Sequence, residues 1–441
     1  MSVMPPQGTG TSAKHVTIMG LGRFGGGAGA ARWWLDQGAR VLVTDLRTGE
    51  ELGDAVAPLE ALTAGDRLEW RLGEHRADDF CNTDLVIANP AVPMPWTNPY
   101  LRAAWDAGVH VTTEITLLIE QLDRNRVIGI TGSAGKSTTA AMVHHVLTSC
   151  NVPSVLGGNI GGSLLPRLQE AKDAEAVVLE LSSAMLWWLG ATDDAPPGAP
   201  RWSPRVALTT NIEPNHLDWH GNEAQYRACK AGLVRHQVEG DMHICGDPGG
   251  DPIQLRLPGE HNQANARMAA AAAMASTSID LEAATSCLAA FTGLPHRLQQ
   301  VHEHDGCIYY NDSKSTTPAA TLLALEAMPE GSQVHLIAGG HDKGISLDAI
   351  ARTSAELAGL YTIGATGPAL AEAAIHGGAA GVHDCGTLEQ AVACASGRMD
   401  AGGVLLLSPG CASWDQFENY QQRGDHFTQL ARAITQRPSR R

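Results

Sequence analysis

The sequence lacks paired cysteine motifs, long apolar runs and any excess of positive charge. Its nine cysteines are scattered and contain no C-x-x-C, so neither a disulfide framework nor a zinc cage is indicated and a reducing cytoplasm fits best. No apolar run reaches the ~18 residues of a membrane helix, and the N-terminus lacks the apolar segment of a secretory signal. We therefore expect residues 1–14 to be a short disordered leader.

The charge balance restricts the class of partner. A formal net charge of −16 argues against nucleic acid or an anionic membrane as the main partner. Small anionic substrates remain possible, because they need only a local basic pocket.

The pattern of apolar runs indicates an α/β fold with more than one domain. At 441 residues the chain is long enough for two or three domains. Apolar runs alternate with helical stretches, which is typical of parallel sheets covered on both faces. The region after Leu298 shows four strands of this kind, and we interpret Trp187-Trp188 as a hydrophobic packing patch and residues 302–305 (HEHD) as a solvated interdomain edge.

The stretch GITGSAGKSTTA, residues 129–140, departs from the usual phosphate loop G-x-x-x-x-G-K-[ST] in the place of one glycine. It follows an apolar run and precedes a helical pattern, so we expect a strand, a loop and a helix. Backbone N–H groups of Gly132 to Gly135 can surround a phosphate, Lys136 can reach its oxygens, and the Ser137 hydroxyl suits Mg²⁺. The stretch predicts nucleotide binding.

Two polar residues at later strand ends could complete a metal site. Glu180 ends the run VVLE, and His216 follows another apolar run. Taken alone, Glu180 could be a solvated loop residue. His216 could be a structural histidine or half of an H-x-x-x-H zinc pair with His220.

A second glycine loop lies near the N-terminus, with G-x-G-x-x-G at Gly20, Gly22 and Gly25. It indicates either a nucleotide site at a helix N-terminus or a tight turn with nothing bound. Asp45, at the end of the next apolar run, could contact an NAD ribose. A dinucleotide-dependent oxidoreductase would leave the second phosphate loop unexplained.

A larger ordered set of motifs resembles the Mur ligases from about His15 to Phe427. The set consists of TGSAGKST, LELSS, NIEPNHLDWHG followed by YRACK, GEHNQAN, GLPHRLQ, NDSKSTTP, AGGHDKG and SPGCASWDQFENYQQRGDHF. The resemblance implies three α/β domains: a Rossmann-like domain over 1–114 for a UDP substrate, a central P-loop ATPase-type parallel-sheet domain over 115–297 for ATP, and a Rossmann-like C-terminal domain over 298–441 for an amino acid.

The resemblance also implies the reaction. It is ATP-dependent amide formation through an acyl phosphate, with two Mg²⁺ ions, and the match is closest to members that add D-glutamate to UDP-N-acetylmuramoyl-L-alanine for peptidoglycan. Addition of L-glutamate or L-alanine, or a nonenzymatic nucleotide-binding paralogue, are the alternatives.

The resemblance assigns site residues, which we list by role. Catalysis falls to Lys136, His216, Lys230 and Lys314, with Lys230 carbamylated by CO₂. The metal ligands are Ser137, Glu180, His216 and the carbamate of Lys230. ATP falls to Gly132, Ser133, Ala134, Gly135, Lys136, Ser137, Thr138, Asn262, Asn265, Arg297 and Asp312. The UDP substrate falls to Gly22, Arg23, Phe24, Asp45, Arg47 and Asn159, and the amino acid to Thr316, Lys343, Ser413 and Tyr420.

The sequence departs from the family pattern in three places. Ala184 and Met185 replace a Phe-Gln pair, and Trp219 stands where a basic residue is common. The first domain has NPAVP where SPGI is more typical. Loss of the glutamine removes a polar contact beside the metal site.

Overall fold

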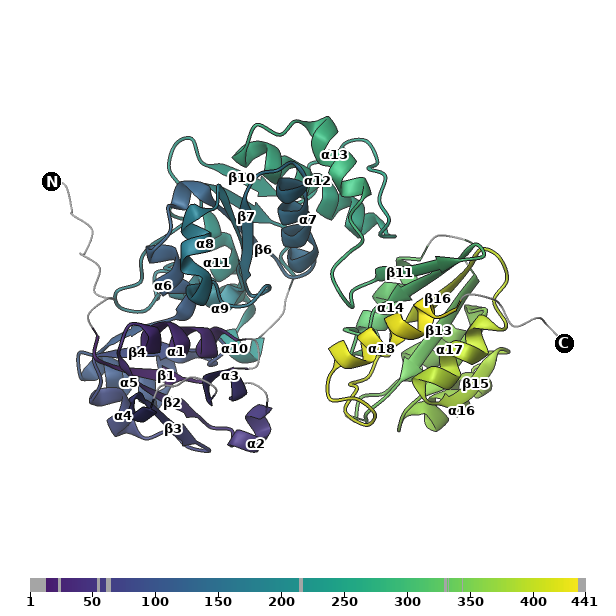
Figure 1. Cartoon of the computed structure of the whole chain (residues 1–441), viewed down its shortest axis with the longest axis horizontal. Coiled ribbons are helices and arrows are strands. Elements are labelled where there is room, and N and C mark those ends of the chain that lie inside the picture. The colour runs from purple at the N-terminus through teal and green to yellow at the C-terminus, as the bar shows by residue number, and fades with distance from the viewer. Residues whose placement is uncertain are drawn as a thin grey trace. The chain divides into compact units, whose positions relative to one another are not determined.

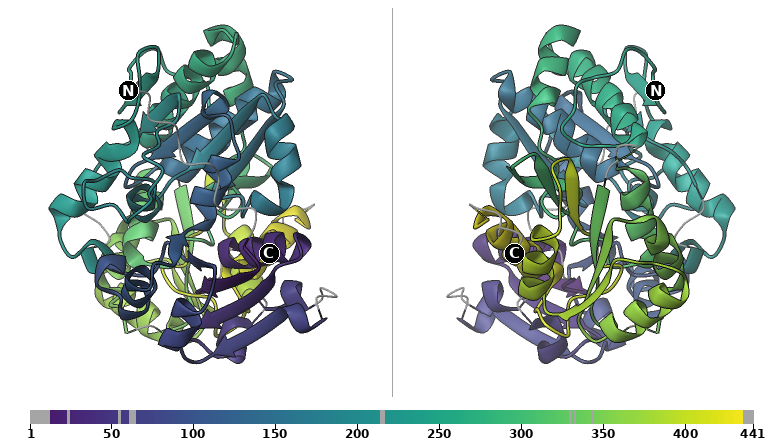
Figure 2. Two further views of the ribbon diagram at one scale, coloured as in Figure 1. Left: turned by 90° about the vertical axis from the view of Figure 1, so that its left-hand side faces the viewer. Right: turned by 90° about the vertical axis from the view of Figure 1, so that its right-hand side faces the viewer.

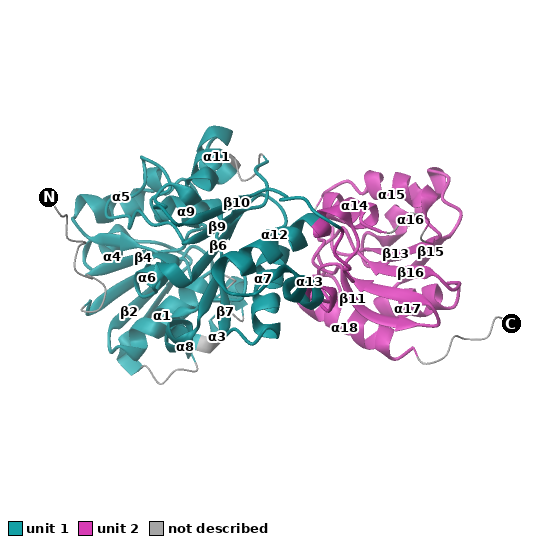
Figure 3. Ribbon diagram, turned by 90° about the horizontal axis from the view of Figure 1, so that it is seen from above, with its two compact units in different colours: residues 1–251, 264–287 teal, residues 252–263, 288–441 magenta. Residues whose placement is uncertain are grey.

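The computed structural model describes residues 13–22, 25–53, 56–60, 65–213, 217–328, 331, 333–342 and 344–434. The chain divides into two compact units, shown in Figure 3. Unit 1 comprises residues 1–251 and 264–287, and unit 2 comprises residues 252–263 and 288–441. Each unit is described by itself. The expected leader falls almost wholly outside the described residues.

The first sheet of unit 1 is parallel, with strand order β3-β2-β1-β4-β5 (Figure 1). Its strands are β1 (His15–Met19), β2 (Arg40–Asp45), β3 (Leu68–Leu72), β4 (Leu85–Ala88) and β5 (His110–Thr112). Its helices are α1 (Gly26–Asp36), α2 (Gly49–Leu52), α3 (Ala57–Glu60), α4 (Ala77–Cys81), α5 (Pro99–Asp106) and α6 (Glu114–Glu120). The order reverses between β1 and β4, and ligands of open α/β sheets bind beyond the carboxyl ends of strands at such a point.

The second sheet of unit 1 is also parallel, with order β10-β9-β6-β8-β7. Its strands are β6 (Val127–Thr131), β7 (Ser154–Gly158), β8 (Ala176–Glu180), β9 (Val206–Thr209) and β10 (Met242–Cys245). The helices are α7 (Lys136–Ser149), α8 (Leu168–Asp173), α9 (Ser183–Trp188), α10 (Leu217–His220), α11 (Glu223–Ala231), α12 (Glu260–Ser276) and α13 (Leu281–Ala289). Strands β6, β8 and β9 are buried throughout, as their apolar sequences predict, so the carboxyl ends of three neighbouring strands meet at one edge.

Unit 2 has one mixed sheet, with order β11-β12-β16-β13-β14-β15 (Figure 1). Figure 2 shows the ribbon from two further sides. Its strands are β11 (Gln299–His304), β12 (Cys307–Asn311), β13 (Gln333–Gly339), β14 (Gly359–Ile363), β15 (Val382–Gly386) and β16 (Gly403–Leu407). Its helices are α14 (Pro318–Glu326), α15 (Asp348–Thr353), α16 (Gly367–His376), α17 (Leu388–Ser396) and α18 (Tyr420–Arg432). The four predicted strands are confirmed as β12, β13, β14 and β16, whereas the two edge strands β11 and β15, which are polar and partly exposed, were not predicted. Residues 302–305, which we interpreted as a solvated interdomain edge, lie in and just after β11.

A tryptophan cluster joins the two sheets of unit 1. Trp96 and Trp105 come from the first half, and Trp187, Trp188 and Trp219 from the second. Trp187 and Trp188 are each 1% exposed and pack edge-to-face at 5.0 Å between ring centroids, which confirms the predicted packing patch. None of the helices among the described residues combines the length and apolar character that crossing a bilayer requires.

Candidate active site

The phosphate loop leaves β6 at Thr131 and enters α7 at Lys136. Gly132 has φ 149°, and a methyl group there would lie 1.8 Å from Thr210 Oγ1 at the end of β9. Gly135 has φ 79° and lies against Asn265, whose Oδ1 would be 2.6 Å from a methyl group. Both glycines are therefore required by backbone conformation and by close neighbours.

Asn211 organises this loop, and sequence reasoning missed it. Its side-chain oxygen accepts hydrogen bonds from the N–H groups of Ser133 at 3.0 Å and Ala134 at 2.9 Å. Thr210 Oγ1 donates to the Ala134 carbonyl at 2.6 Å, and Lys136 Nζ donates to the Ser133 carbonyl at 3.1 Å. Two of the loop N–H groups expected to surround a phosphate are thus engaged by Asn211.

Other phosphate donors come from the start of α7. The first N–H groups of a helix have no acceptor within the helix, and its N-terminus carries partial positive charge. Ser137 and Thr138 lie in this first turn, and the Ser137 side chain is buried. The helix N-terminus and Lys136 therefore form an anion site beside the loop.

Glu180 lies at the end of β8, opposite Ile130 of β6 in the register. It is 1% exposed; Oε1 accepts from Asn159 Nδ2 at 2.9 Å, and Oε2 is buried without a hydrogen-bond partner among the described residues. Such an unsatisfied carboxylate oxygen fits a Mg²⁺ ligand. His216 lies outside the described residues, and within them no cluster of three or more His, Cys, Asp or Glu side chains could hold a metal.

Lys230 projects from α11 under the phosphate loop and is only 2% exposed. Its Nζ donates to the Gly132 carbonyl at 2.6 Å and to Thr131 Oγ1 at 3.4 Å, and lies 5.0 Å from the Tyr226 ring centroid. Burial, with the nearby charge of Lys136, lowers the pKa of Lys230 to about 7. Near neutral pH this lysine is a partly neutral amine.

The N-terminal glycine loop follows β1 and leads into α1. Gly20 and Gly22 have positive φ, and a methyl group on Gly22 would lie 2.6 Å from Asn89 Nδ2, which donates to the Gly20 carbonyl at 3.2 Å. The loops after β1 and β4 are thereby joined at the switch point. Arg23 and Phe24 lie outside the described residues.

Asp45 and Arg47 follow β2 beside this loop. Asp45 Oδ2 accepts from the Leu21 N–H at 3.0 Å, and Oδ1 accepts from the Arg47 N–H at 3.0 Å. Burial of Asp45 opposes ionisation, but the hydrogen bonds and charge of Arg47 outweigh it and lower the pKa of Asp45. The carboxylate therefore fixes both the glycine loop and Arg47.

Glu114, at the start of α6, is a further buried carboxyl, and sequence reasoning missed it. Ser163 Oγ donates to Glu114 Oε1 at 2.6 Å and accepts from the Leu165 N–H at 3.3 Å. Burial raises the pKa of Glu114 to about 7. A single acidic residue at a helix start carries no sequence signal of such a role.

One cavity of about 760 Å³ connects these groups within unit 1. Its lining includes the predicted UDP-site residues Gly22, Asp45, Arg47 and Asn159, and the predicted phosphate-site residues Gly132, Ser133, Lys136 and Lys230. Glu114 and Ser163 also line it, as do the family departures Ala184, Met185 and Trp219. The two glycine loops, far apart in sequence, thus face a common space large enough for a substrate.

Asn262 and Asn265 of α12 fall in different units. Asn265, in unit 1, accepts from Thr139 Oγ1 at 3.2 Å and lies against the phosphate loop. Asn262, in unit 2, donates to the Pro258 carbonyl at 2.6 Å. Both are buried, and Asn265 contacts the loop at Gly135.

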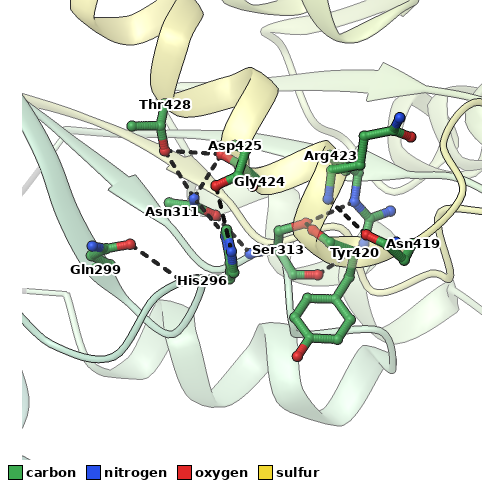
Figure 4. Close-up of polar contacts among 11 residues, drawn as sticks. His296, Gln299, Asn311, Ser313, Asn419, Tyr420, Arg423, Gly424, Asp425 and Thr428 are labelled. Atoms are coloured by element: carbon green, nitrogen blue, oxygen red, sulfur yellow. Dashed lines mark hydrogen bonds and ion pairs between the residues drawn. The ribbon is translucent and has the colours of Figure 1, made fainter. Parts of the chain in front are cut away.

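In unit 2, a buried arginine joins the loops that follow β12 and β16 (Figure 4). Arg423 is 1% exposed and donates to the carbonyls of Ser313 at 2.9 Å and Cys411 at 3.1 Å, and from Nε to Ser313 Oγ at 3.0 Å. Burial lowers the pKa of Arg423 to about 10. Sequence reasoning missed this residue, which holds the segment of Ser413 against the segment of Lys314.

The remaining unit 2 residues gather around these loops. Burial raises the pKa of Asp312 to about 6, and Ser408 Oγ donates to it at 2.8 Å. The exposed Lys314 has its Nζ 5.4 Å from the Tyr420 ring centroid. Thr316 is half-buried and Ser413 is 2% exposed, whereas Lys343 lies outside the described residues.

Arg297 follows a strained histidine in the same unit. His296 and Leu298 both have positive φ, at 63° and 43°. His296 Nδ1 accepts from Asn311 Nδ2 at 3.1 Å, and Asn311 Nδ2 also donates to the Gly424 carbonyl at 2.8 Å (Figure 4). Strain of this kind is found at functional sites and is held here by buried hydrogen bonds.

Comparison with known proteins gave matches over most of the chain. Three family models match: the Mur ligase MurD-like N-terminal domain at residues 14–113, the Mur ligase middle domain at 130–249, and the Mur ligase glutamate ligase domain at 296–411. The chain is 34% identical to the UDP-N-acetylmuramoylalanine--D-glutamate ligase of Symbiobacterium thermophilum, over 92% of this chain and 95% of that protein. It is 34% identical to the Geobacillus kaustophilus protein of the same name, over 94% and 97%.

A solved structure agrees with the fold. The crystal structure of the UDP-N-acetylmuramate-alanine ligase MurC from Thermotoga maritima matches with a TM-score of 0.57. The two sequences are 18% identical, and the match covers 96% of this chain and 100% of the MurC chain. At this identity the likeness supports the fold alone.

Proposed function

This chain belongs to the Mur ligase family, and we propose that it joins D-glutamate to UDP-N-acetylmuramoyl-L-alanine at the expense of ATP, in peptidoglycan precursor synthesis. The predicted three-domain α/β fold and the resemblance to the Mur ligases are confirmed. The bounds 1–114, 115–297 and 298–441 stay a prediction. The observation that carries the proposal is the single cavity shared by the phosphate loop and the N-terminal glycine loop.

The proposed reaction has two displacement steps. A carboxylate oxygen of the acceptor attacks the γ-phosphorus of ATP, and ADP leaves with the electron pair of the broken P–O bond. The amino nitrogen of glutamate then attacks the acyl carbon, phosphate leaves, and the nitrogen loses a proton. Neither step needs an enzyme nucleophile, so the protein acts by positioning the reactants and neutralising charge.

The phosphate site supports the first step. Lys136 and the first turn of α7 place positive charge beside the loop, where the leaving diphosphate gains negative charge. Thr139 connects Asn265 to this helix, which supports an adenine contact from α12. For Asn262, Arg297 and Asp312 of unit 2, contacts with ATP are proposed from the family resemblance.

The donor set fits Mg²⁺. Among the described residues the buried Oε2 of Glu180 has no hydrogen-bond donor, and Mg²⁺ is usually held by one or two carboxylates together with substrate phosphates. Glu180 and Ser137 would hold the nucleotide ion, and His216 with a carbamate on Lys230 the second. The ions would supply charge neutralisation between the acceptor carboxylate and the triphosphate.

Lys230 is suited to carbamylation. Only a neutral amine adds CO₂, and the lowered pKa of Lys230 provides one near neutral pH. The nitrogen of the neutral amine forms a bond to the CO₂ carbon, one C=O electron pair moves onto oxygen, and the nitrogen releases one proton, so the neutral amine becomes a carboxylate-like ligand. This change would also remove the cost of a buried ammonium.

The remaining predicted residues form two groups, one for the acceptor in unit 1 and one for the amino acid in unit 2. Gly22, Asp45, Arg47 and Asn159 share the cavity and would hold the UDP part, with Arg23 and Phe24. In unit 2, Thr316, Lys343, Ser413 and Tyr420 would hold glutamate, with Lys314 nearby. A lysine with hydroxyl groups suits the second carboxylate of glutamate.

The test is phosphate release by the purified protein with ATP, Mg²⁺ and UDP-N-acetylmuramoyl-L-alanine. D-glutamate, L-glutamate, L-alanine and no amino acid are compared, and the product mass is measured. We expect release with D-glutamate and a product heavier by one glutamyl residue. Release with L-glutamate alone would change the stereochemical assignment, and no release with any of them would refute the proposed reaction.

A further inference from the structure

Ser183 lines the cavity beside Ala184 and Met185, in a wall that also contains polar residues such as Ser182 and Asp218. It is the first residue of α9 and is 4% exposed. The residues that follow it, Ala184 and Met185, line the cavity, as does Trp219. The Ser182 hydroxyl accepts from the Met185 N–H as the cap of α9, whereas the Ser183 hydroxyl is oriented by the contacts described next.

Two buried side chains fix the direction of that hydroxyl. His220 is 1% exposed, and its Nε2 lies 2.8 Å from Ser183 Oγ. Cys229 is fully buried, and its Sγ lies 3.9 Å from the other ring nitrogen, His220 Nδ1. The three side chains therefore form a chain that runs from the interior to the cavity.

The chemistry of the thiol sets the direction of each hydrogen bond. A cysteine thiol carries a hydrogen that it can donate, and Cys229 Sγ lies within hydrogen-bond reach of His220 Nδ1, so we assign the S–H as donor and Nδ1 as acceptor. With Nδ1 as the acceptor, the ring N–H is on Nε2, which donates to Ser183 Oγ. Because this bond occupies the oxygen as acceptor, the Ser183 O–H proton must be donated to another group.

Within the part of the chain that the structure describes, Ser183 Oγ has one hydrogen-bond partner, His220. The histidine ring is held between Trp219, at 4.5 Å between centroids, and Tyr226, at 5.3 Å. The Tyr226 hydroxyl is 2.6 Å from Ser133 Oγ of the phosphate loop. The hydrogen-bonded series Ser183, His220 and Cys229, which we call the relay, therefore lies next to the position proposed for phosphoryl transfer.

We propose that Ser183 donates a hydrogen bond to the reacting carboxylate of the acceptor, and that His220 and Cys229 are positioning residues that hold its hydroxyl in the donating orientation. The inference rests on the proposed function and deepens it by naming a contact to the acceptor. It follows that Ser183 acts on acceptor binding and orientation, and leaves ATP binding unchanged.

The test compares Ser183→Ala, Ser183→Thr and His220→Phe by calorimetric binding of UDP-N-acetylmuramoyl-L-alanine and by steady-state kinetics. A hydrogen bond to a charged group predicts a weakening of acceptor binding of about 10- to 100-fold for Ser183→Ala. Ser183→Thr retains the hydroxyl and should restore most of the affinity. The KM for ATP should stay within about twofold in all three, since none of these residues belongs to the phosphate loop.

A double-mutant cycle separates positioning from a structural role. If His220 acts through Ser183, the loss caused by His220→Phe should disappear when Ser183 is already alanine, whereas independent structural effects would add. Ser203→Ala is the matched control, because Ser203 is also buried and hydrogen-bonded but does not line the cavity. It should leave acceptor binding unchanged.

The outcomes distinguish this inference from the proposed function. Wild-type protein that binds the acceptor, together with Ser183→Ala that binds it equally well, would overturn the relay and leave the function standing. Additive losses in the cycle would overturn the positioning role of His220. Wild-type protein that fails to bind this acceptor would overturn the proposed function, and the inference with it.

Discussion

Replacement of Lys230 by methionine should stabilise unit 1 while it removes activity. The folded lysine has a pKa of about 7 against an ordinary value of 10.5. That difference corresponds to roughly 5 kcal/mol of folding free energy lost when both states are protonated, and to about 4 kcal/mol at pH 7. Methionine fills a similar volume without a charge.

Part of this gain is offset by hydrogen bonds. Lys230 Nζ donates to the Gly132 carbonyl and to Thr131 Oγ1, and leaving a buried acceptor unsatisfied costs about 1–3 kcal/mol. We therefore expect Lys230→Met to raise the free energy of unfolding by about 2 kcal/mol at pH 7, from the difference of these terms. Urea unfolding followed by circular dichroism, in buffers freed of CO₂, measures it.

The sign of the pH dependence provides a sharper test. The folded pKa lies below the unfolded one, so between about pH 7 and 10.5 the unfolded state binds more protons and wild-type stability rises with pH. The advantage of Lys230→Met should be greatest below pH 7 and shrink steadily as the pH is raised to 9. If the difference in unfolding free energy between Lys230→Met and the wild type stays constant from pH 6 to 9, the lowered pKa of a buried Lys230 is refuted.

Carbamylation of Lys230 can be observed directly. With ¹³C-bicarbonate, the wild-type protein should give a carbamate resonance in NMR that is absent from Lys230→Met. An ordinary surface lysine is almost wholly protonated near pH 8 and should contribute little. If no carbamate forms, Lys230 must act as an amine, and the proposed second metal ligand is lost.

Three further substitutions test the phosphate site. Lys136→Ala should reduce ATP turnover by about 100- to 1,000-fold with the circular dichroism spectrum unchanged, and normal turnover would remove Lys136 from the site. Glu180→Gln should raise the Mg²⁺ concentration for half-maximal activity by roughly 10- to 100-fold, and an unchanged Mg²⁺ titration would exclude Glu180 as a ligand. Gly132→Ala forces a methyl group against Thr210, so ATP binding measured by calorimetry should be lost, and wild-type affinity would show that the loop tolerates a side chain.

Much of the fold was predictable because buried parallel strands have distinctive sequences. Strands β6, β8 and β9 are apolar runs that stop at a polar residue or a glycine, so their order along the chain and their carboxyl ends could be located. The edge strands β11 and β15 of unit 2 were missed because they are polar and partly exposed. Their strand character comes from pairing with β12 and β14, which sequence periodicity does not reveal.

The glycines and charged residues of the candidate site could be predicted from the sequence. The residues that hold them in place through hydrogen bonds could not. Asn211 reaches Ser133 across 78 positions of the chain, and Arg423 reaches Ser313 across 110. Ser183 and His220 come within hydrogen-bond distance only because α9 and α10 pack together. Such contacts depend on how the elements pack, and no local pattern of residues encodes them.

The tryptophan cluster also gives unit 1 an intrinsic fluorescence signal. Nine of the ten tryptophans lie in unit 1, and only Trp414 lies in unit 2. Trp219 lines the cavity and lies 5.6 Å from Trp96 and 6.2 Å from Trp187 between ring centroids, close enough for excitation to pass among the indoles. Intrinsic fluorescence should therefore report occupancy of the cavity without any label, because a ligand beside Trp219 changes the emission of the whole cluster.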